Sequence, residues 1–140
     1  RLFLAVREKL GITYQINTFL NSYYDTSAFG VYFSTNKQQY SKVIDIVYKE
    51  FKKIKNIPVK DKELRKVKEY LKGGILLGME STTNRMMRIA NSILYYDRVI
   101  SLEEYLKRID KITAEDVRKS ANELLNEAKL VKVILKSDTK

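Results

Sequence analysis

Two residues near the start of the chain, Arg7 and Tyr14, have side chains that could act together in chemistry. An apolar stripe at helical spacing leads up to Arg7, and the β-branched and aromatic run Ile12–Leu20 follows it. Gly11 lies between the two patterns, where a glycine ends a helix by adopting the left-handed conformation. Such a helix-to-strand corner brings the fixed positive charge of Arg7 close to the neutral phenol donor of Tyr14.

Both residues also have ordinary structural interpretations. An arginine in the last turn of a helix interacts favourably with the negative end of the helix dipole. A tyrosine early in a strand commonly packs its ring against the core and leaves its hydroxyl at the rim. The residues alone therefore leave both a functional and a structural role open for Arg7 and Tyr14.

Other kinds of catalytic chemistry find little support, because the 140 residues include no histidine and no cysteine. Disulfides, thiolate chemistry and histidine-based zinc sites are excluded on composition. Carboxylates alone make a poor zinc site, and six glutamates occupy positions typical of surface helix residues: Glu63, Glu69, Glu80, Glu103, Glu104 and Glu115. We therefore predict that this chain binds no metal and no other cofactor by itself.

The formal net charge of +10 raises the question of an anionic partner. The densest basic stretch, Lys49–Lys62, is rich in lysine, lies on a predicted helix with an apolar face and has few aromatic residues within it. Such a pattern is typical of a solvated helix face. A nucleic-acid-binding module is an alternative supported by little beyond net charge, and salt-dependent DNA binding would revive it. We expect no nucleic-acid partner.

Hydrophobic patterning bears on the compartment. The longest apolar runs are too short to span a bilayer, and no secretory signal is visible. We therefore expect no membrane partner and a cytoplasmic location.

The pattern predicts an α+β fold, with helices on one side of an antiparallel sheet. A hairpin of strands Ile12–Leu20 and Ala28–Ser34 is followed by a helix that Thr35 caps with Gln38, and the chain breaks at residues 57–59. Further predicted elements are a long helix from Asp61, a bend at Glu80–Asn84, helices Arg85–Tyr96, Leu102–Lys111 and Ala114–Asn126, and a last strand Lys129–Lys136 that returns to the sheet.

Several local features of these helices are also predicted. Ser101-x-x-Glu104 and Thr113-x-x-Asp116 are helix-start signals. Gly73-Gly74 weakens its helix and indicates close packing against the sheet, with a hinge as the alternative. Met86-Met87 is expected to fill gaps in the core.

Taken in order, segments along the whole chain resemble the C-terminal domain of the insulinase (pitrilysin) type of zinc peptidases, which includes mitochondrial processing peptidase. The matching segments are Arg1-Leu2-Phe3, Val6-Arg7-Glu8-Lys9, Gly11-x-x-Tyr14, Tyr24-Asp25-Thr26, Phe29-Gly30, Glu63-Leu64, Lys72-Gly73, Glu80-Ser81-Thr82, Arg85-Met86, Leu94-Tyr95-Tyr96, Leu102-Glu103-Glu104 and Thr113-Ala114-Glu115-Asp116-Val117.

The resemblance implies a processing-peptidase-like α/β roll that is incomplete at its N-terminal end, because the family's domain opens with a further strand and helix. Residues 1–140 would then form a single partial domain, the C-terminal, non-zinc domain of a larger peptidase. In the family, zinc is held by an inverted His-x-x-Glu-His motif and a distal Glu in the N-terminal domain, outside this chain.

The resemblance also implies a role for the corner. The family's arginine and tyrosine that match Arg7 and Tyr14 reach toward the zinc-bound substrate, where they would bind the scissile carbonyl and its developing oxyanion. The expected function is part of a zinc-dependent endopeptidase that cleaves peptides or unfolded proteins, with this chain inactive alone. Expected partners are a peptide substrate and a zinc-bearing N-terminal domain or subunit, in a homo- or hetero-oligomer.

A second interpretation has the same resemblance behind it. The family's domain also occurs in non-catalytic partner subunits of processing peptidases and in core subunits of respiratory complexes. In such a protein the chain would serve structure and assembly.

Overall fold

The chain divides into two compact units. The computed structural model describes residues 1–8, 10–13 and 15–136. The N-terminal unit comprises Arg1–Ile57 together with Arg118–Lys140, and the helical unit comprises Pro58–Val117.

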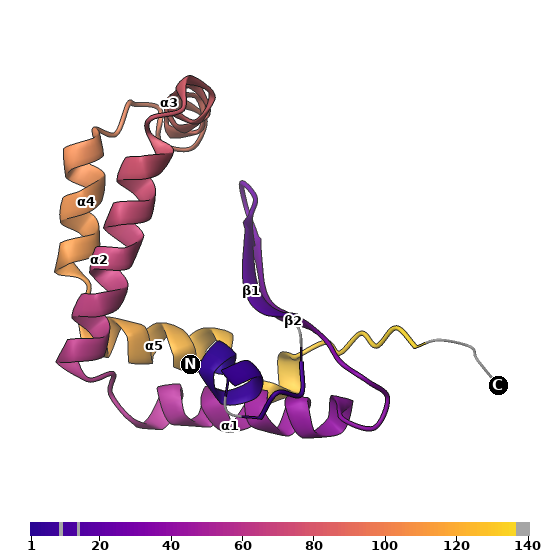
Figure 1. Ribbon diagram of the computed structural model, residues 1–140. Coiled ribbons are helices and arrows are strands. Elements are labelled where there is room, and N and C mark those ends of the chain that lie inside the picture. Colours follow the sequence, from indigo (N-terminus) through magenta and orange to yellow (C-terminus); the bar gives the residue numbers. More distant parts are fainter. Residues whose placement is uncertain (9, 14, 137–140) are drawn as a thin grey trace. The chain divides into compact units, whose positions relative to one another are not determined.

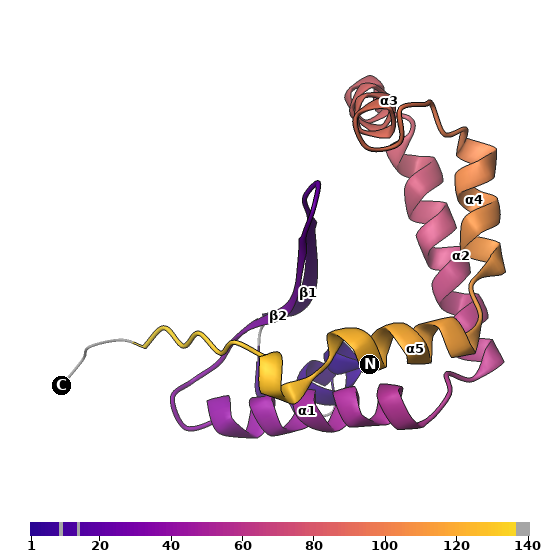
Figure 2. The same cartoon turned by 180° about the vertical axis from the view of Figure 1, so that it is seen from behind.

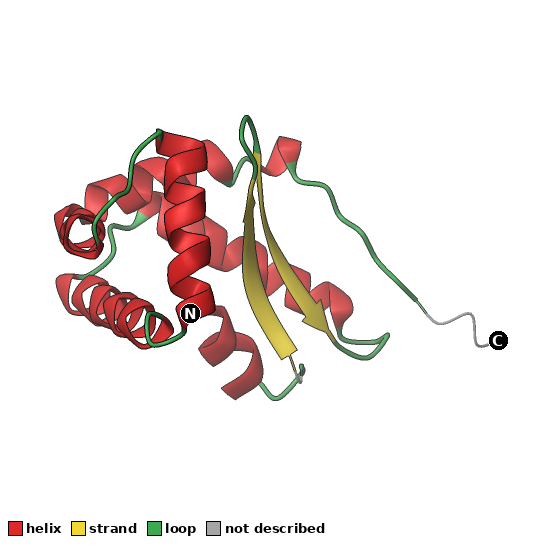
Figure 3. Ribbon diagram, turned by 90° about the horizontal axis from the view of Figure 1, so that it is seen from above, coloured by secondary structure: helices red, strands yellow, loops and turns green. Residues whose placement is uncertain are grey.

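The N-terminal unit contains a short π-helix, a hairpin and a long helix (Figure 1). The π-helix η1 (Phe3–Glu8) precedes strands β1 (Gln15–Ser22) and β2 (Ser27–Ser34), and helix α1 (Tyr40–Asn56) follows. The strands pair antiparallel along their full length, from Gln15 opposite Ser34 to Ser22 opposite Ser27, and Figure 3 shows the two arrows running in opposite directions. The predicted hairpin is therefore confirmed, with β1 starting three residues later than expected.

An apolar core joins these elements. Val6 of η1 and Val43 of α1 are fully buried, and Ile16 and Val47 complete the buried cluster. The predicted helical stripes before Arg7 and in α1 supply most of this core. Seven partly buried apolar residues pack around it: Leu2, Ala5, Ile12, Val31, Phe33, Ile46 and Phe51.

The other face of the hairpin carries an aromatic ring packed over a glycine. Phe19 and Gly30 are directly opposite each other in the register. A Cβ atom added to Gly30 would overlap the Phe19 ring, so the ring can occupy this position only opposite a glycine. A glycine within a strand often marks a close approach, and here the Phe19 side chain makes it across the strands.

The start of α1 differs from the prediction. The helix begins at Tyr40, and its N-cap residue, Gln39, makes no side-chain capping bond. The Thr35 hydroxyl instead donates a hydrogen bond to the carbonyl of Ile12. The predicted Thr35–Gln38 capping box is therefore wrong, because the threonine ties the end of β2 to the chain before β1.

The helical unit contains α2 (Asp61–Gly78), α3 (Thr82–Tyr96), α4 (Leu102–Lys111) and the first turn of α5 (Ala114–Leu124). Helices α2 and α4 lie side by side (Figure 2). The side chain of Ser101 accepts a bond from the backbone N–H of Glu104, as predicted. Thr113 and Asp116 bond each other's backbone N–H groups reciprocally, which confirms the second helix-start signal.

Packing within this unit is looser than predicted. Met86 and Met87 are 60% and 49% exposed, so they do not fill a core, and Cβ atoms on Gly73 and Gly74 would meet open space. The two glycines therefore have no close neighbour within their own unit, and packing against the sheet, which lies in the other unit, stays a prediction. Ten-residue α4 covers only part of α2, which leaves apolar side chains of the longer helix exposed: Val67, Leu71, Leu76 and Leu77.

The C-terminal segment does not form the predicted last strand. Helix α5 ends at Leu124, a 3₁₀ turn covers Glu127–Lys129, and residues 130–136 run without regular secondary structure. The Nζ atoms of Lys132 and Lys136 lie 6.0 and 5.1 Å from the ring centroids of Tyr48 and Tyr40 on α1. These contacts place Lys132 and Lys136 against the tyrosine rings of α1. The segment pairs with neither strand of the two-stranded sheet that the structure describes, so it forms no strand.

Candidate functional site

The π-helix η1 carries Arg7 beside an anchored residue. Val6 is fully buried in the core, while Arg7 is exposed in the last turn. A π-helix holds an extra residue per turn relative to an α-helix. Anchoring through Val6 leaves the neighbouring Arg7 side chain facing away from the core.

Gly11 ends this helix as the sequence predicts. Its φ angle is +62°, in the left-handed region that costs glycine little. The Gly11 N–H donates to the Arg7 carbonyl at 3.0 Å, and the Ile12 N–H reaches the Val6 carbonyl at 3.4 Å. The glycine thereby caps the carbonyl of the candidate functional residue itself.

The Arg7 guanidinium contacts an aromatic ring. Its Cζ atom lies 4.9 Å from the ring centroid of Phe3, four residues earlier on η1. Among the residues that the structure describes, no carboxylate pairs with Arg7. A ring consumes none of the five N–H donors of an arginine, so this contact leaves them for an oxygen acceptor. The sequence pattern assigns Phe3 only to the apolar stripe, although the i, i+4 spacing of Phe3 and Arg7 signals this contact.

Tyr14, the other predicted site residue, lies outside the described residues, so its predicted meeting with Arg7 stays a prediction. The chain around this position is tied to β2 by threonines. Thr13 is 5% exposed, and its hydroxyl lies within hydrogen-bond distance of the carbonyls of Gln15 and Ser34. Together with the Thr35 bond to Ile12, it fixes the backbone where the corner enters β1. The sequence pattern does not predict this role for the pair of threonines.

A pocket opens beside the corner in the same unit. It has a volume of 380 Å³ and is lined by Gly11, Ile12, Ser34, Thr35, Asn36 and Gln39. Its polar side chains are hydroxyls and carboxamides, which bind peptide-like groups through hydrogen bonds and supply no strong metal ligand.

The predicted basic face of α1 borders a second pocket of 570 Å³. Lys52 pairs with Glu127 at 3.7 Å, and Lys53 pairs with Glu50 on the same helix. Two of its lysines are thus partly neutralised by acidic neighbours, as expected of a solvated surface.

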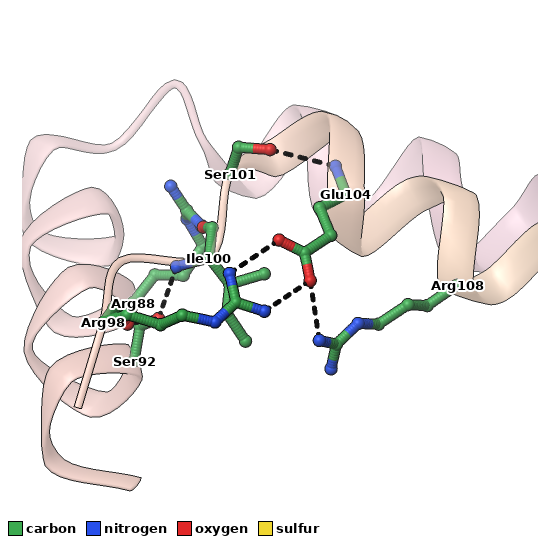
Figure 4. Close-up of polar contacts among 7 residues, drawn as sticks. All are labelled: Arg88, Ser92, Arg98, Ile100, Ser101, Glu104 and Arg108. Carbon is green, nitrogen blue, oxygen red and sulfur yellow. Dashed lines mark hydrogen bonds and ion pairs between the residues drawn. The ribbon is translucent and has the colours of Figure 1, made fainter. Parts of the chain in front are cut away.

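A cluster of Arg98, Glu104 and Arg108 lies in the helical unit and has a structural role. Arg98 donates two hydrogen bonds to Glu104 at 2.8 and 2.7 Å, and Arg108 adds a third at 2.7 Å (Figure 4). Hydrogen bonds from Arg98 first, and then from Arg108, lower the pKa of Glu104 from 4.5 to about 2. A carboxylate held ionised in this way is no general acid near neutral pH.

The loop that connects α3 and α4 is fixed by the buried hydroxyl of Ser92. Ser92 donates to the carbonyl of Arg98 and accepts the N–H of Ile100, both at 2.7 Å, and Arg88 donates to the Ile100 carbonyl at 2.6 Å. Figure 4 shows these groups beside the Glu104 cluster. They hold the connection between α3 and α4.

Metal and membrane features are both missing from the part of the chain that the structure describes. Its residues hold no group of three metal-ligating side chains, and none of its helices combines the length and apolar character needed to cross a bilayer.

Residues 1–71, which include the corner and its helix, match the family described as the peptidase M16 inactive domain. The chain therefore belongs to this family, the insulinase-like M16 group, and corresponds to its C-terminal domain. The resemblance inferred from the sequence is confirmed.

Sequence relatives of the chain are named zinc proteases. An uncharacterized zinc protease of Streptomyces coelicolor is 32% identical over 134 residues, covering 96% of this chain and 29% of that protein. One of Mycobacterium leprae is 31% identical over 126 residues, covering 90% and 28%. The chain thus spans less than a third of the length of these curated relatives.

Solved structures share the fold. A conserved protein from Enterococcus faecalis superposes with a TM-score of 0.76 at 19% identity, covering 86% of this chain and 28% of that one. The periplasmic protease PqqL from Escherichia coli gives 0.69 at 16% identity, covering 89% and 14%. A chain of complex III2 from Candida albicans gives 0.75 at 20% identity, covering 85% and 28%. The α+β fold with its antiparallel hairpin is therefore confirmed as that of known proteins.

Proposed function

We propose that this chain is the C-terminal, non-zinc domain of a zinc-dependent endopeptidase that cleaves peptides or unfolded proteins. Its contribution is a clamp on the substrate carbonyl, made by Arg7 and Tyr14. The observation that supports this role is an exposed Arg7 whose backbone is capped by a left-handed glycine and whose donors are not used by any carboxylate among the described residues.

The chemistry follows from charge development. When water attacks a scissile carbonyl, negative charge grows on its oxygen, and donors placed beforehand stabilise that oxygen more strongly in the transition state. Arg7 would supply a fixed cation, and Tyr14 a neutral O–H donor. Neither group needs to transfer a proton for this purpose.

The metal would come from elsewhere in the enzyme. The relatives are named zinc proteases, and the 140 residues contain no histidine or cysteine. We therefore place zinc on an N-terminal domain or subunit and expect this chain alone to bind none stoichiometrically. Elemental analysis after dialysis tests this, and tightly bound zinc would contradict it.

We also propose a cytoplasmic location, which cell fractionation can test. The chain would pair with that zinc-bearing domain or subunit. Apolar side chains exposed on α2, α3 and the hairpin support the pairing, since faces of this kind mark interaction sites. We expect the isolated chain to self-associate, and sedimentation that finds a monodisperse monomer would contradict this.

Arg7→Ala and Tyr14→Phe in the active, zinc-bearing peptidase test the clamp. Removing one such donor costs about 3 kcal/mol, or roughly a hundredfold in turnover. Zinc content should stay unchanged because the metal is held elsewhere, and the melting temperature should move little for Tyr14→Phe. Near-normal turnover in both variants would rule out the clamp.

A scaffold subunit is the second candidate. The exposed apolar faces and the likeness in fold to a chain of complex III2 support a role in assembly. This candidate predicts that Arg7→Ala leaves turnover of the assembly intact, whereas changes on the apolar faces reduce the yield of assembled complex.

A further inference from the structure

We propose that Phe3 is a positioning residue for Arg7, setting the direction of the guanidinium through the contact between ring and cation. This inference rests on the proposed clamp and identifies a residue that acts through it. The contact itself is the 4.9 Å approach of the Arg7 Cζ atom to the Phe3 ring centroid.

The geometry of η1 explains why the contact forms. Residues four apart on a helix are neighbours on its surface, so the ring of Phe3 lies next to the side chain of Arg7. The backbone that carries both side chains is anchored. Val6, which lies between them in the sequence, is fully buried, and Gly11 caps the Arg7 carbonyl. The ring is therefore attached to the same rigid element as the cation.

The exposure of Phe3 also calls for an explanation. Its side chain is 42% exposed, although Val6 on the same helix is completely enclosed. A phenylalanine at this exposure contributes less to the core than one fully enclosed, but its ring face can attract a cation. The ring thus contributes an interaction that an aliphatic residue of similar size would not.

A ring suits this task better than a carboxylate. An arginine side chain has many rotamers, and restricting them in advance lowers the cost of binding a substrate oxygen. A carboxylate would restrict them too, but it would neutralise the charge and occupy the donors. An aromatic ring restricts the guanidinium and leaves both charge and donors for the carbonyl oxygen.

The test compares Phe3→Leu with Phe3→Tyr in the active peptidase that carries this chain. Leucine keeps an apolar side chain without a ring, and tyrosine keeps the ring. We expect Phe3→Leu to lower kcat about two- to fivefold, the factor equivalent to an exposed cation–π contact of about 0.5–1 kcal/mol. Phe3→Tyr should keep the turnover of the unchanged enzyme. In Phe3→Leu, KM should change less than kcat because the clamp acts most strongly in the transition state.

A double-mutant cycle separates positioning from folding. If Phe3 acts through Arg7, Phe3→Leu should have no further effect on kcat in the Arg7→Ala background. Phe51→Leu is the matched control, since Phe51 packs against the same core without contacting Arg7. We expect it to lower the melting temperature while turnover per folded molecule stays normal.

A spectroscopic readout does not depend on activity. The Arg7 side-chain protons should show an upfield ring-current shift by NMR, which Phe3→Leu removes and Phe3→Tyr keeps. An absent shift, an equal loss of kcat with and without Arg7, or a Phe3→Tyr enzyme as slow as Phe3→Leu would each overturn the inference.

Failure of the inference and failure of the proposed function give different results. If Arg7→Ala is slow but Phe3→Leu is normal, positioning by Phe3 is wrong and the clamp stands. If Arg7→Ala itself has near-normal turnover, both are wrong.

Discussion

The N-terminal unit and the helical unit are stabilised in different ways. In the former, Val6 and Val43 are fully enclosed in one apolar cluster that joins η1, the hairpin and α1. In the latter, helices α2 and α4 have no fully buried side chain, and ion pairs and caps connect the elements. The candidate site lies in the unit with the packed core. Precise placement of a cation such as Arg7 needs a rigid support, which close packing provides.

The polar connections of the helical unit are specific but individually weak. Lys72 of α2 bonds Glu69 at 2.7 Å and Asp110 of α4 at 2.9 Å, and these bonds raise the pKa of Lys72, with Glu69 contributing most. Exposed pairs of this kind contribute little stability in water. Beside these ion pairs, apolar side chains of α2 such as Leu76 and Leu77 stay exposed.

Equal substitutions in the two units should have unequal effects. Val43→Ala removes two methyl groups from the enclosed core and should destabilise the chain by about 2 kcal/mol. Val67→Ala makes the same change on the exposed face of α2, where surface substitutions stay within about 0.5 kcal/mol. Urea unfolding of both variants measures the difference, and equal losses would show that the helical unit has a core of comparable importance.

Glycine-to-alanine changes should alter the stability of the two units in opposite directions. Gly11→Ala forces a left-handed conformation on a residue with a Cβ and should cost about 1–2 kcal/mol. Gly11→Asn should recover part of this loss, because asparagine tolerates the left-handed region. Thermal unfolding provides the measurement, and an unaffected Gly11→Ala protein would contradict the cap observed at the corner.

Gly74→Ala in α2 should act in the opposite direction. A Cβ atom there meets open space, so alanine should stabilise the helix by up to about 1 kcal/mol. Circular dichroism on heating measures the gain in the chain alone. A loss of stability instead would mean that the glycine pair packs closely against a neighbouring surface, as the sequence pattern indicates.

The smallest expected effect is on the stability of the protein at acidic pH. The pKa of Glu104 is lowered from 4.5 to about 2, so the stability it contributes is present above pH 4.5 and is lost as the pH falls toward 2. Glu104→Gln should flatten the loss of stability across that range. Glu103→Gln, which removes a single exposed pair with Lys107, is the control and should leave the acid dependence in place. Acid titration followed by circular dichroism distinguishes them.

Local signals in the sequence identify much of this protein. Gly11 closes its helix, Ser101 and Thr113 cap theirs, and the segments around Arg7 indicate the family. Such features depend on residues a few positions apart, so the spacing of the chain is enough to predict them. The absence of histidine and cysteine likewise limits metal chemistry through composition alone.

Contacts between distant residues were decided by the tertiary structure. The pattern around Thr35 predicts a helix cap, yet its hydroxyl bonds Ile12, 23 residues away. The alternating residues of Lys129–Lys136 look like a strand, but a strand exists only where another backbone offers its hydrogen bonds, and here Lys132 and Lys136 lie over tyrosine rings of α1 instead. Met86 and Met87 are apolar residues of a kind that fills cores, yet both are exposed. Burial depends on what packs against a helix face and not on the residues of that face alone.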